Sequence, residues 1–179
     1  HRIHIPTLGW VRLKEKGYIP TTKQGYRIKS GTVSYQAGRY YVSVLVDVQE
    51  DTKQELNDFG LGIDLGIKDF AVMSNGITTK NINKTAKLKK LEKKLKREQR
   101  KLSKRFLVAK KENRKLSESK NYQKQRIKVA KIHEKIMNMR TDFLNKLSTY
   151  IIKNHDIICI EDLNTKGLLH NNKLSKSIA

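Results

Sequence analysis

The chain has 179 residues, of which 37% are hydrophobic and 31% are charged, and its formal net charge is +22. This balance indicates a polyanionic partner, with nucleic acid as the first choice and an anionic membrane surface as the lesser one, because the basic segment lacks an aromatic-rich apolar face. One cysteine excludes an internal disulfide and a zinc site built from two or four cysteines of this chain, and no apolar run approaches membrane-spanning length.

The first 57 residues are typical of an all-β segment. A short alternating run at 9–13 predicts one strand, and two longer runs at 28–35 and 39–46 predict a hairpin joined by a glycine-containing turn. The polar, acidic segment 47–58 that follows predicts a domain boundary.

Three aromatic residues in this segment allow two interpretations. Trp10, Tyr40 and Tyr41 could stack on nucleobases. They could equally be ordinary β-core residues or cross-strand aromatic pairs.

Apolar runs at 61–66 and 69–74 predict two strands joined by a tight, glycine-assisted turn. A third strand is expected at about 77–82. Asp64 lies within the first apolar run, and a carboxylate costs several kcal/mol to bury unpaired, so a cation is expected beside it. The alternative is a turn aspartate that accepts hydrogen bonds from nearby backbone.

The segment 84–140 carries 23 Lys or Arg against five Glu and no Asp, without a proline or a glycine to interrupt a helix. Apolar residues recur in it at spacings of three and four. They form two stripes: Leu88, Leu91, Leu95, Leu102, Phe106 and Ala109; and Val129, Ile132, Ile136, Met139, Phe143, Leu147 and Ile151. These stripes predict an antiparallel helical hairpin with its turn at 116–121.

The outer face of this hairpin is rich in lysine and arginine. A charge run is often only a solvated face, but this excess of one sign is too large to be neutralised by pairs along the helix, so phosphate contact is favoured. We expect nucleic acid to contact Lys87, Lys90, Lys94, Arg97, Arg100, Lys104, Arg105 and Arg126.

The run 156–160 predicts a last strand, covered on both faces and lying inside the sheet, with Cys159 as a buried small hydrophobe. Glu161 follows at its C-terminal end, where open α/β sheets place functional groups. If this strand neighbours the one that holds Asp64, the two carboxylates converge. Converging carboxylates favour Mg²⁺ or Mn²⁺, and two such ions support phosphodiester cleavage.

Several of these runs also resemble a known family. Gly62–Asp69, followed by Phe70–Val72, is similar to the first RuvC motif of the TnpB (OrfB) proteins encoded by bacterial and archaeal insertion sequences. Ile160–Asn164 with Lys166–Leu168 resembles the second RuvC motif.

The resemblance extends to both sides of these motifs. His133-Glu134 and Arg140–Ser148 resemble the family's H-x₆-R-x-D-F-x-x-K-L-S run on a long helix. Gly9–Val11 and Gly38–Val42 look like the wedge β-domain that precedes it.

The resemblance implies an α+β chain. An N-terminal β-barrel-like wedge segment would occupy residues 1–57. A partial RNase H-like (RuvC) domain would occupy residues 58–179, with the basic helical hairpin inserted at about 84–154.

The implied activity is that of an RNA-guided DNA endonuclease, with DNA and guide RNA as partners and no membrane. Asp64 and Glu161 would be the catalytic residues that bind Mg²⁺ or Mn²⁺. We expect Asp69 and Asp162 to be turn and capping residues and His133 to pack or hydrogen-bond. The implied location is the cytoplasm of a prokaryote, near the nucleoid, which the single cysteine suits.

The sequence also departs from the family pattern, which continues with a zinc ribbon of paired Cys-x-x-Cys and a third catalytic Asp. No acidic residue follows Asp162, no cysteine pair exists, and the first residue is His1. We therefore expect a fragment of a longer protein that is inactive alone, and we do not expect zinc. The alternatives are a DNA- or RNA-binding protein with a vestigial RuvC site and, third, a ribosomal-type RNA binder, which explains the charge but not the motifs.

Overall fold

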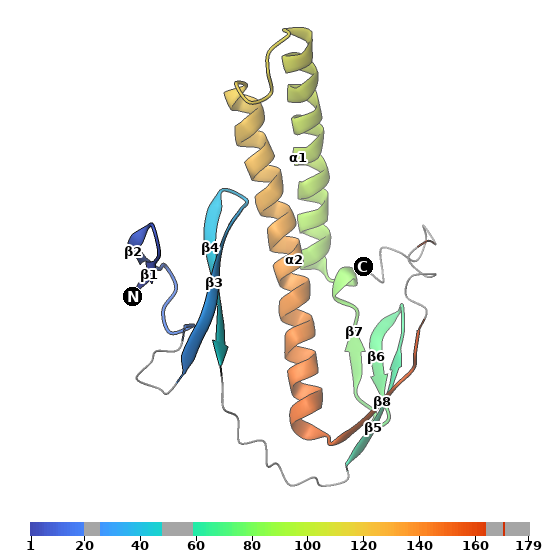
Figure 1. Ribbon diagram of the computed structural model, residues 1–179. Coiled ribbons are helices and arrows are strands. Elements are labelled where there is room, and N and C mark those ends of the chain that lie inside the picture. Colours follow the sequence, from blue (N-terminus) through green and yellow to red (C-terminus); the bar gives the residue numbers. More distant parts are fainter. Residues whose placement is uncertain (20–25, 48–58, 164–169, 171–179) are drawn as a thin grey trace. The chain divides into compact units, whose positions relative to one another are not determined.

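The computed structural model describes residues 1–19, 26–47, 59–163 and 170 (Figure 1). The chain divides into two compact units, His1–Lys53 and Gln54–Ala179. Both strands and helices are present, which confirms the α+β class. The predicted boundary after residue 57, all of the connector except Asp47, and the motif residues from Asn164 to Leu168 lie outside the described residues.

The first unit contains two antiparallel ribbons. They are formed by β1 (Arg2–Ile5) with β2 (Gly9–Arg12), and by β3 (Arg27–Gln36) with β4 (Arg39–Asp47). In the second ribbon, Ala37 and Gly38 both have positive φ, which matches the two-residue turn that suits the twist of a hairpin. The predicted hairpin is therefore confirmed. The strands described in this unit form two separate two-stranded sheets and no closed one, so a barrel is not established.

Two aromatic residues of this unit, Trp10 and Tyr40, are exposed and form cross-strand pairs. Trp10 lies opposite His4, with ring centroids 5.4 Å apart, and Tyr40 lies opposite Tyr35 at 4.9 Å. For Trp10 and Tyr40 the interpretation as cross-strand pairs is confirmed and a place in a core is wrong, whereas Tyr41 lies opposite Ser34. Base stacking stays a prediction.

The second unit is a four-stranded sheet with a helical hairpin. Its elements are β5 (Gly60–Leu65), β6 (Asp69–Met73), β7 (Thr78–Lys80), the 3₁₀ turn η2 (Ile82–Lys84), α1 (Ala86–Lys111), α2 (Lys120–Asn154) and β8 (Ile157–Ile160). The strand order is β7-β6-β5-β8, with β5, β6 and β7 antiparallel and β8 parallel to β5. The three strands predicted between 61 and 82 are confirmed, the third in a shorter form.

One face of this sheet is covered by the C-terminal part of α2. Leu61 and Ile63 of β5 are buried with Met73 of β6 and Ile151 of α2. Alternate residues of a strand point to opposite faces, so Gly62 and Asp64 lie on the other face of β5. We call that side the open face.

The last strand lies at the edge of the described sheet. β8 pairs only with β5 among the described strands, and Ile157, Cys159 and Ile160 are exposed. The predictions of an interior strand and of a buried Cys159 are therefore wrong for the part of the chain that the structure describes. An apolar run indicates that a segment forms a strand, but not how many neighbours that strand has.

The helical hairpin is confirmed, with α1 and α2 side by side (Figure 1). The apolar seam centres on Leu88, Ile132 and Ile136, with Leu91, Leu95 and Met139 packed against them. The predicted second stripe packs against two elements, α1 and the sheet. Its later members, Phe143, Leu147 and Ile151, contact the sheet through Phe70 and the core of β5 and β6.

The turn between the helices begins earlier than the predicted 116–121. α1 ends at Lys111 because Asn113 adopts a left-handed conformation (φ 50°). The amide of Arg114 donates to the carbonyl of Ala109 (3.0 Å), and that of Asn113 donates to Lys110 (3.1 Å). This pair of bonds is the Schellman arrangement, for which Asn is the second choice after Gly.

A polar group interrupts the apolar seam. The side chain of Glu98 is only 2% exposed and accepts hydrogen bonds from Gln125 Nε2 (2.9 Å) and Lys101 Nζ (3.2 Å), while Lys128 Nζ lies 3.2 Å away. We call these four residues the Glu98 network. The hydrogen bond from Gln125, followed by those from Lys128 and Lys101, outweighs desolvation and lowers the pKa of Glu98 to about 2. Sequence reasoning missed this network, although Glu98 occupies a stripe position, three residues after Leu95.

We expect the Glu98 network to make hairpin stability depend on pH in the acid range. Because folding lowers the pKa of Glu98 from 4.5 to about 2, its stabilising contribution is complete above pH 4.5 and is lost as the pH falls toward 2. Glu98→Gln should lower the unfolding temperature at neutral pH, as measured by circular dichroism. It should also make the unfolding temperature depend less on pH between 4.5 and 2. Glu118→Gln, which removes an exposed carboxylate 4.0 Å from Lys115, is the control, and equal effects of both changes would contradict the prediction.

Candidate metal site and basic hairpin

The parallel pairing of β5 and β8 aligns the two predicted catalytic acids. The ladder ends with Ile63 opposite Ile160, so the next residue of β5 is Asp64 and the residue that directly follows β8 is Glu161. Neighbouring strands lie about 4.8 Å apart, and residues in register project to the same face. The structure therefore brings together two carboxylates that are far apart in the sequence.

Both carboxylates are accessible to solvent. Asp64 lies opposite Val72 of β6 on the open face, and Asp64 and Glu161 are both exposed. The expectation that Asp64 is buried within its apolar run is therefore wrong, because only the alternate residues Leu61 and Ile63 face α2. The reason to expect a cation at this position is the pairing of two carboxylates and not the burial of Asp64.

The donor chemistry of this pair suits a hard divalent cation. Carboxylate oxygens are the ligands that Mg²⁺ and Mn²⁺ prefer. Among the residues that the structure describes, no group of three His, Cys, Asp or Glu could hold a metal ion. Asp64 and Glu161 could supply at most two ligand side chains, and water or phosphate oxygens would have to complete the coordination.

The turn that follows Asp64 is tied to the start of the hairpin. Lys84 Nζ donates to the carbonyl of Lys68 (3.1 Å), and the side-chain Nδ2 of Asn81 donates to the carbonyl of Ile67 (3.4 Å). Arg140 Nε of α2 in turn donates to Asn83 Oδ1 (2.9 Å). The hairpin therefore positions the turn beside Asp64 as well as returning the chain to Glu161. Sequence reasoning did not assign these roles to Asn81 and Asn83.

Three further polar residues of the motifs are not members of the aligned pair. Asp69 begins β6, and Asp162 is exposed in the segment after β8. Their predicted turn and capping roles stay predictions. His133 Nε2 lies 3.3 Å from Gln99 Nε2 within hydrogen-bonding distance, which confirms that it hydrogen-bonds.

All eight residues predicted to contact nucleic acid are exposed. Five of them lie in one row along α1, where spacings of three and four residues put side chains on one side of a helix. Together with Lys101 these five form the first basic row: Lys87, Lys90, Lys94, Arg97, Lys101 and Lys104. A second row beside it consists of Lys89, Lys93, Lys96 and Arg100. At about 1.5 Å per residue, the first row extends over about 25 Å.

The other predicted contacts differ in their surroundings. Arg100 belongs to the second row and Arg126 lies near the start of α2. Arg105 donates to the backbone carbonyl of Asn121 (2.7 Å) and so closes the end of the hairpin. Its guanidinium therefore has a structural partner as well as the predicted role.

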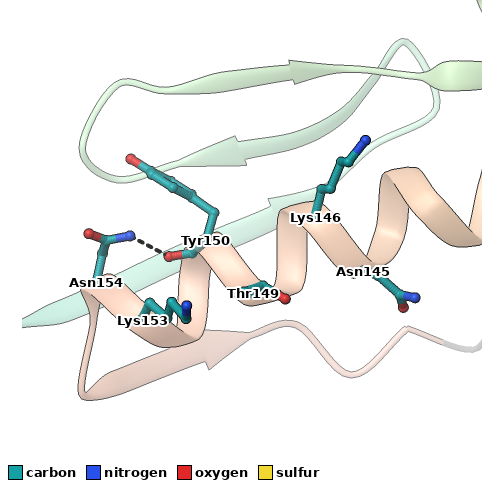
Figure 2. Close-up of a pocket in the computed structure, with 6 residues that line it drawn as sticks. All are labelled: Asn145, Lys146, Thr149, Tyr150, Lys153 and Asn154. Carbon is teal, nitrogen blue, oxygen red and sulfur yellow. Dashed lines mark hydrogen bonds between the residues drawn. The ribbon is translucent and has the colours of Figure 1, made fainter. Parts of the chain in front are cut away.

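A hollow of about 420 Å³ lies along the C-terminal part of α2 (Figure 2). It is lined by Asn145, Lys146, Thr149, Tyr150, Lys153 and Asn154. Lys146 Nζ is 2.7 Å from Asp142, and Asn154 Nδ2 donates to the carbonyl of Tyr150 (2.6 Å). The surface that these residues present to the hollow is almost entirely apolar, and none of them is a carboxylate, so the hollow differs chemically from the Asp64–Glu161 pair.

The described helices include none that is both long and apolar enough to cross a membrane.

Comparison with known proteins identifies the family. The model of the OrfB_IS605 family, described as "Probable transposase", matches residues 43–172, which include both carboxylates and the whole hairpin. The chain belongs to this family. The predicted resemblance to TnpB (OrfB) proteins is thereby confirmed.

Two curated relatives are similar over most of the chain. One, from Escherichia coli K12, is named "Putative RNA-guided DNA endonuclease InsQ" and is 33% identical over 93% of this chain. Another, from Streptomyces pristinaespiralis, is named "Putative RNA-guided DNA endonuclease" and is 33% identical over 95% of this chain. In each case the matched region spans 37% of the relative's length.

The turn after Asp64 should tolerate no side chain at Gly66. A Cβ there would lie 2.9 Å from the backbone oxygen of Asp69, so Gly66→Ala should lower the free energy of unfolding by about 1–3 kcal/mol. Gly60→Ala, at the start of β5, is the control, because an added Cβ there meets no atom within 4 Å. Chemical denaturation of both variants tests this, and equal losses would show that the close approach is unimportant.

Proposed function

We propose that this chain forms part of a TnpB-type, RNA-guided DNA endonuclease, in which β5 to β8 build an RNase H-like (RuvC) core. The observation that carries the proposal is the alignment of Asp64 with Glu161 on adjacent parallel strands, on a face that no described helix covers. Family membership and the names of both relatives support the same function.

In this proposal Asp64 and Glu161 hold Mg²⁺ or Mn²⁺. When bound, two such ions about 4 Å apart would activate water and stabilise the leaving oxygen in phosphodiester hydrolysis. The protein's own contribution is to hold two carboxylates side by side on a rigid sheet, with their oxygens open to solvent and to an incoming phosphate. The hydrogen bonds from Asn81 and Lys84 to the turn at 67–68 keep the backbone beside Asp64 in place.

The basic hairpin would hold the nucleic acid. Its two basic rows present ten cations on one helix, close enough together for several to contact successive phosphates. Phosphate contacts position a nucleic acid without reading its sequence, so the hairpin would bind DNA, guide RNA or their heteroduplex through the backbone.

A second candidate function is a DNA- or RNA-binding protein with a catalytically incomplete RuvC site. The observation that favours it is that the aligned carboxylates are only two, since no group of three candidate metal ligands occurs among the described residues. Both candidates predict binding, and they differ in whether the carboxylates bind metal and support cleavage.

Metal binding separates the two candidates. Mn²⁺ titration followed by electron paramagnetic resonance should detect binding that Asp64→Asn and Glu161→Gln each weaken at least about tenfold, because each removes one of the two aligned carboxylates. Asp142→Asn, which removes an exposed carboxylate on α2 paired with Lys146, is the control. Equal Mn²⁺ affinity in all four proteins would favour the vestigial site.

Cleavage is the second test of the metal site. In the whole endonuclease of which this chain is proposed to form part, loaded with guide RNA, Asp64→Ala should abolish Mg²⁺-dependent cleavage of target DNA. Its affinity for nucleic acid should be unchanged or raised, because a negative charge near the phosphates is removed. Cleavage that survives this change would rule out Asp64 as a catalytic residue.

The phosphate-binding role predicts a steep dependence of affinity on salt. The logarithm of the binding constant should fall linearly with that of the salt concentration, and each phosphate contact removed should reduce the slope by about 0.7–0.9. Fluorescence anisotropy should show this reduction for Lys90→Gln and Lys94→Gln. Lys80→Gln, the same charge change on β7, is the control, and a slope near zero for the unaltered chain would exclude phosphate tracking.

A further inference from the structure

The outer end of α1 carries an apolar patch that the proposed function does not use. Three consecutive residues are exposed there: Phe106 (40%), Leu107 (62%) and Val108 (55%). Single exposed apolar residues are ordinary, whereas three adjacent ones on a helix that is otherwise charged outside are not. We call these three residues the apolar tip.

The apolar tip continues the basic rows. Val108 follows Lys104 by four residues, at the end of the first basic row, and Leu107 follows Arg100 by seven, at the end of the second. Phe106 lies at the margin of the seam, with its ring centroid 6.4 Å from that of Tyr122 on α2. A ligand held by the phosphate-binding rows would therefore meet an apolar surface at one end of the hairpin.

The end of the hairpin is held in one shape by polar contacts. Arg105 donates to the carbonyl of Asn121, Gln123 Nε2 donates to the carbonyl of Leu116 (2.7 Å), and the Schellman bonds at Asn113 end α1. Hydrogen bonds therefore hold the turn beside the apolar tip in one conformation, so a partner that binds there loses little free energy to the ordering of this turn.

The surrounding charge limits what that partner can be. Lys104, Arg105, Lys110 and Lys111 flank the apolar tip on α1, and only Glu112 among the neighbouring residues of this helix is acidic. A partner that carries regular negative charges and flat apolar faces side by side meets both requirements. Unpaired nucleotides have this combination, because their bases are open to stacking, whereas a duplex covers its base faces.

We propose that the apolar tip contacts unpaired nucleobases of single-stranded DNA or RNA, while the basic rows hold the adjoining phosphates. This inference rests on the proposed nucleic-acid binding of the hairpin. It adds to it a place on the hairpin where single-stranded and double-stranded ligands are distinguished. Stacking of an aromatic side chain such as Phe106 on an unpaired base is a known way for proteins to hold single-stranded nucleic acid.

The first test is a stacking signal at Phe106. Trp10 is the only tryptophan, so Phe106→Trp in a Trp10→Phe background places a single fluorophore in the apolar tip. Its emission should be quenched by a single-stranded oligonucleotide at saturation, and not by a blunt duplex or by heparin. Quenching of the same size by all three ligands would overturn the inference, because heparin has negative charges but no bases.

The second test is a loss of affinity confined to single strands. Leu107→Ala with Val108→Ala should weaken binding of a single-stranded oligonucleotide about tenfold and leave duplex affinity unchanged. Met137→Ala, 49% exposed on α2, is the control for loss of an exposed apolar side chain. Circular dichroism checks that the hairpin of each variant is intact, and Leu107 and Val108 are chosen because they lie outside the seam.

The outcomes separate this inference from the proposed function. Salt-dependent binding that is insensitive to the double variant would overturn the inference and leave the phosphate-binding role standing. Binding of neither single strands nor duplexes by the unaltered chain would overturn both. Self-association that the double variant abolishes, with oligonucleotide affinity unchanged, would show that the apolar tip is a protein contact and would also overturn the inference.

Discussion

The parallel pairing of β5 with β8 is the constraint on which the rest of the second unit depends. Two parallel strands cannot be joined by a tight turn, so the chain must cross back to the end of the sheet where the first strand begins before it can form the second. In this protein the connection consists of β6, β7 and then the helical hairpin, and the return of α2 brings β8 into the register that places Glu161 beside Asp64. The acidic pair and the basic rows are therefore products of one connection.

The later helix, α2, makes this connection rigid by packing against two partners. Its first part contacts α1 through Ile132 and Ile136, and its last part contacts the sheet through Ile151. The Glu98 network lies in the first part, where it places a buried carboxylate between helices that are both strongly basic. An apolar residue at Glu98 would fill the same volume but would leave Lys101 and Lys128 without a neutralising partner. The network therefore favours one pairing of the two helices over neighbouring ones.

Sequence periodicity predicted most of the elements, because alternation of polar and apolar residues follows directly from which side of a strand or helix is covered. It failed where a neighbour outside the element decides the outcome. The exposed edge of β8 depends on how many strands pair with it, and the burial of Glu98 depends on Gln125 of the other helix. The early end of α1 depends on the left-handed conformation of Asn113, a residue that is also common within helices. The alignment of Asp64 with Glu161 was predicted only conditionally, since a sequence pattern does not state which strands are adjacent.

The exposure of Asp64 changes the physical argument for a metal ion. A buried, unpaired carboxylate would require a cation to offset its desolvation, whereas two exposed carboxylates on adjacent strands require none for stability. The pair then costs the fold only a modest repulsion, and a metal ion would bind mainly when other oxygen ligands, such as phosphates, are present to complete its coordination. Phosphates are what the basic rows would concentrate on the same unit. Metal binding and nucleic-acid binding should therefore reinforce each other. A bound phosphate supplies oxygen ligands to the metal ion, and the metal ion supplies positive charge to the phosphate.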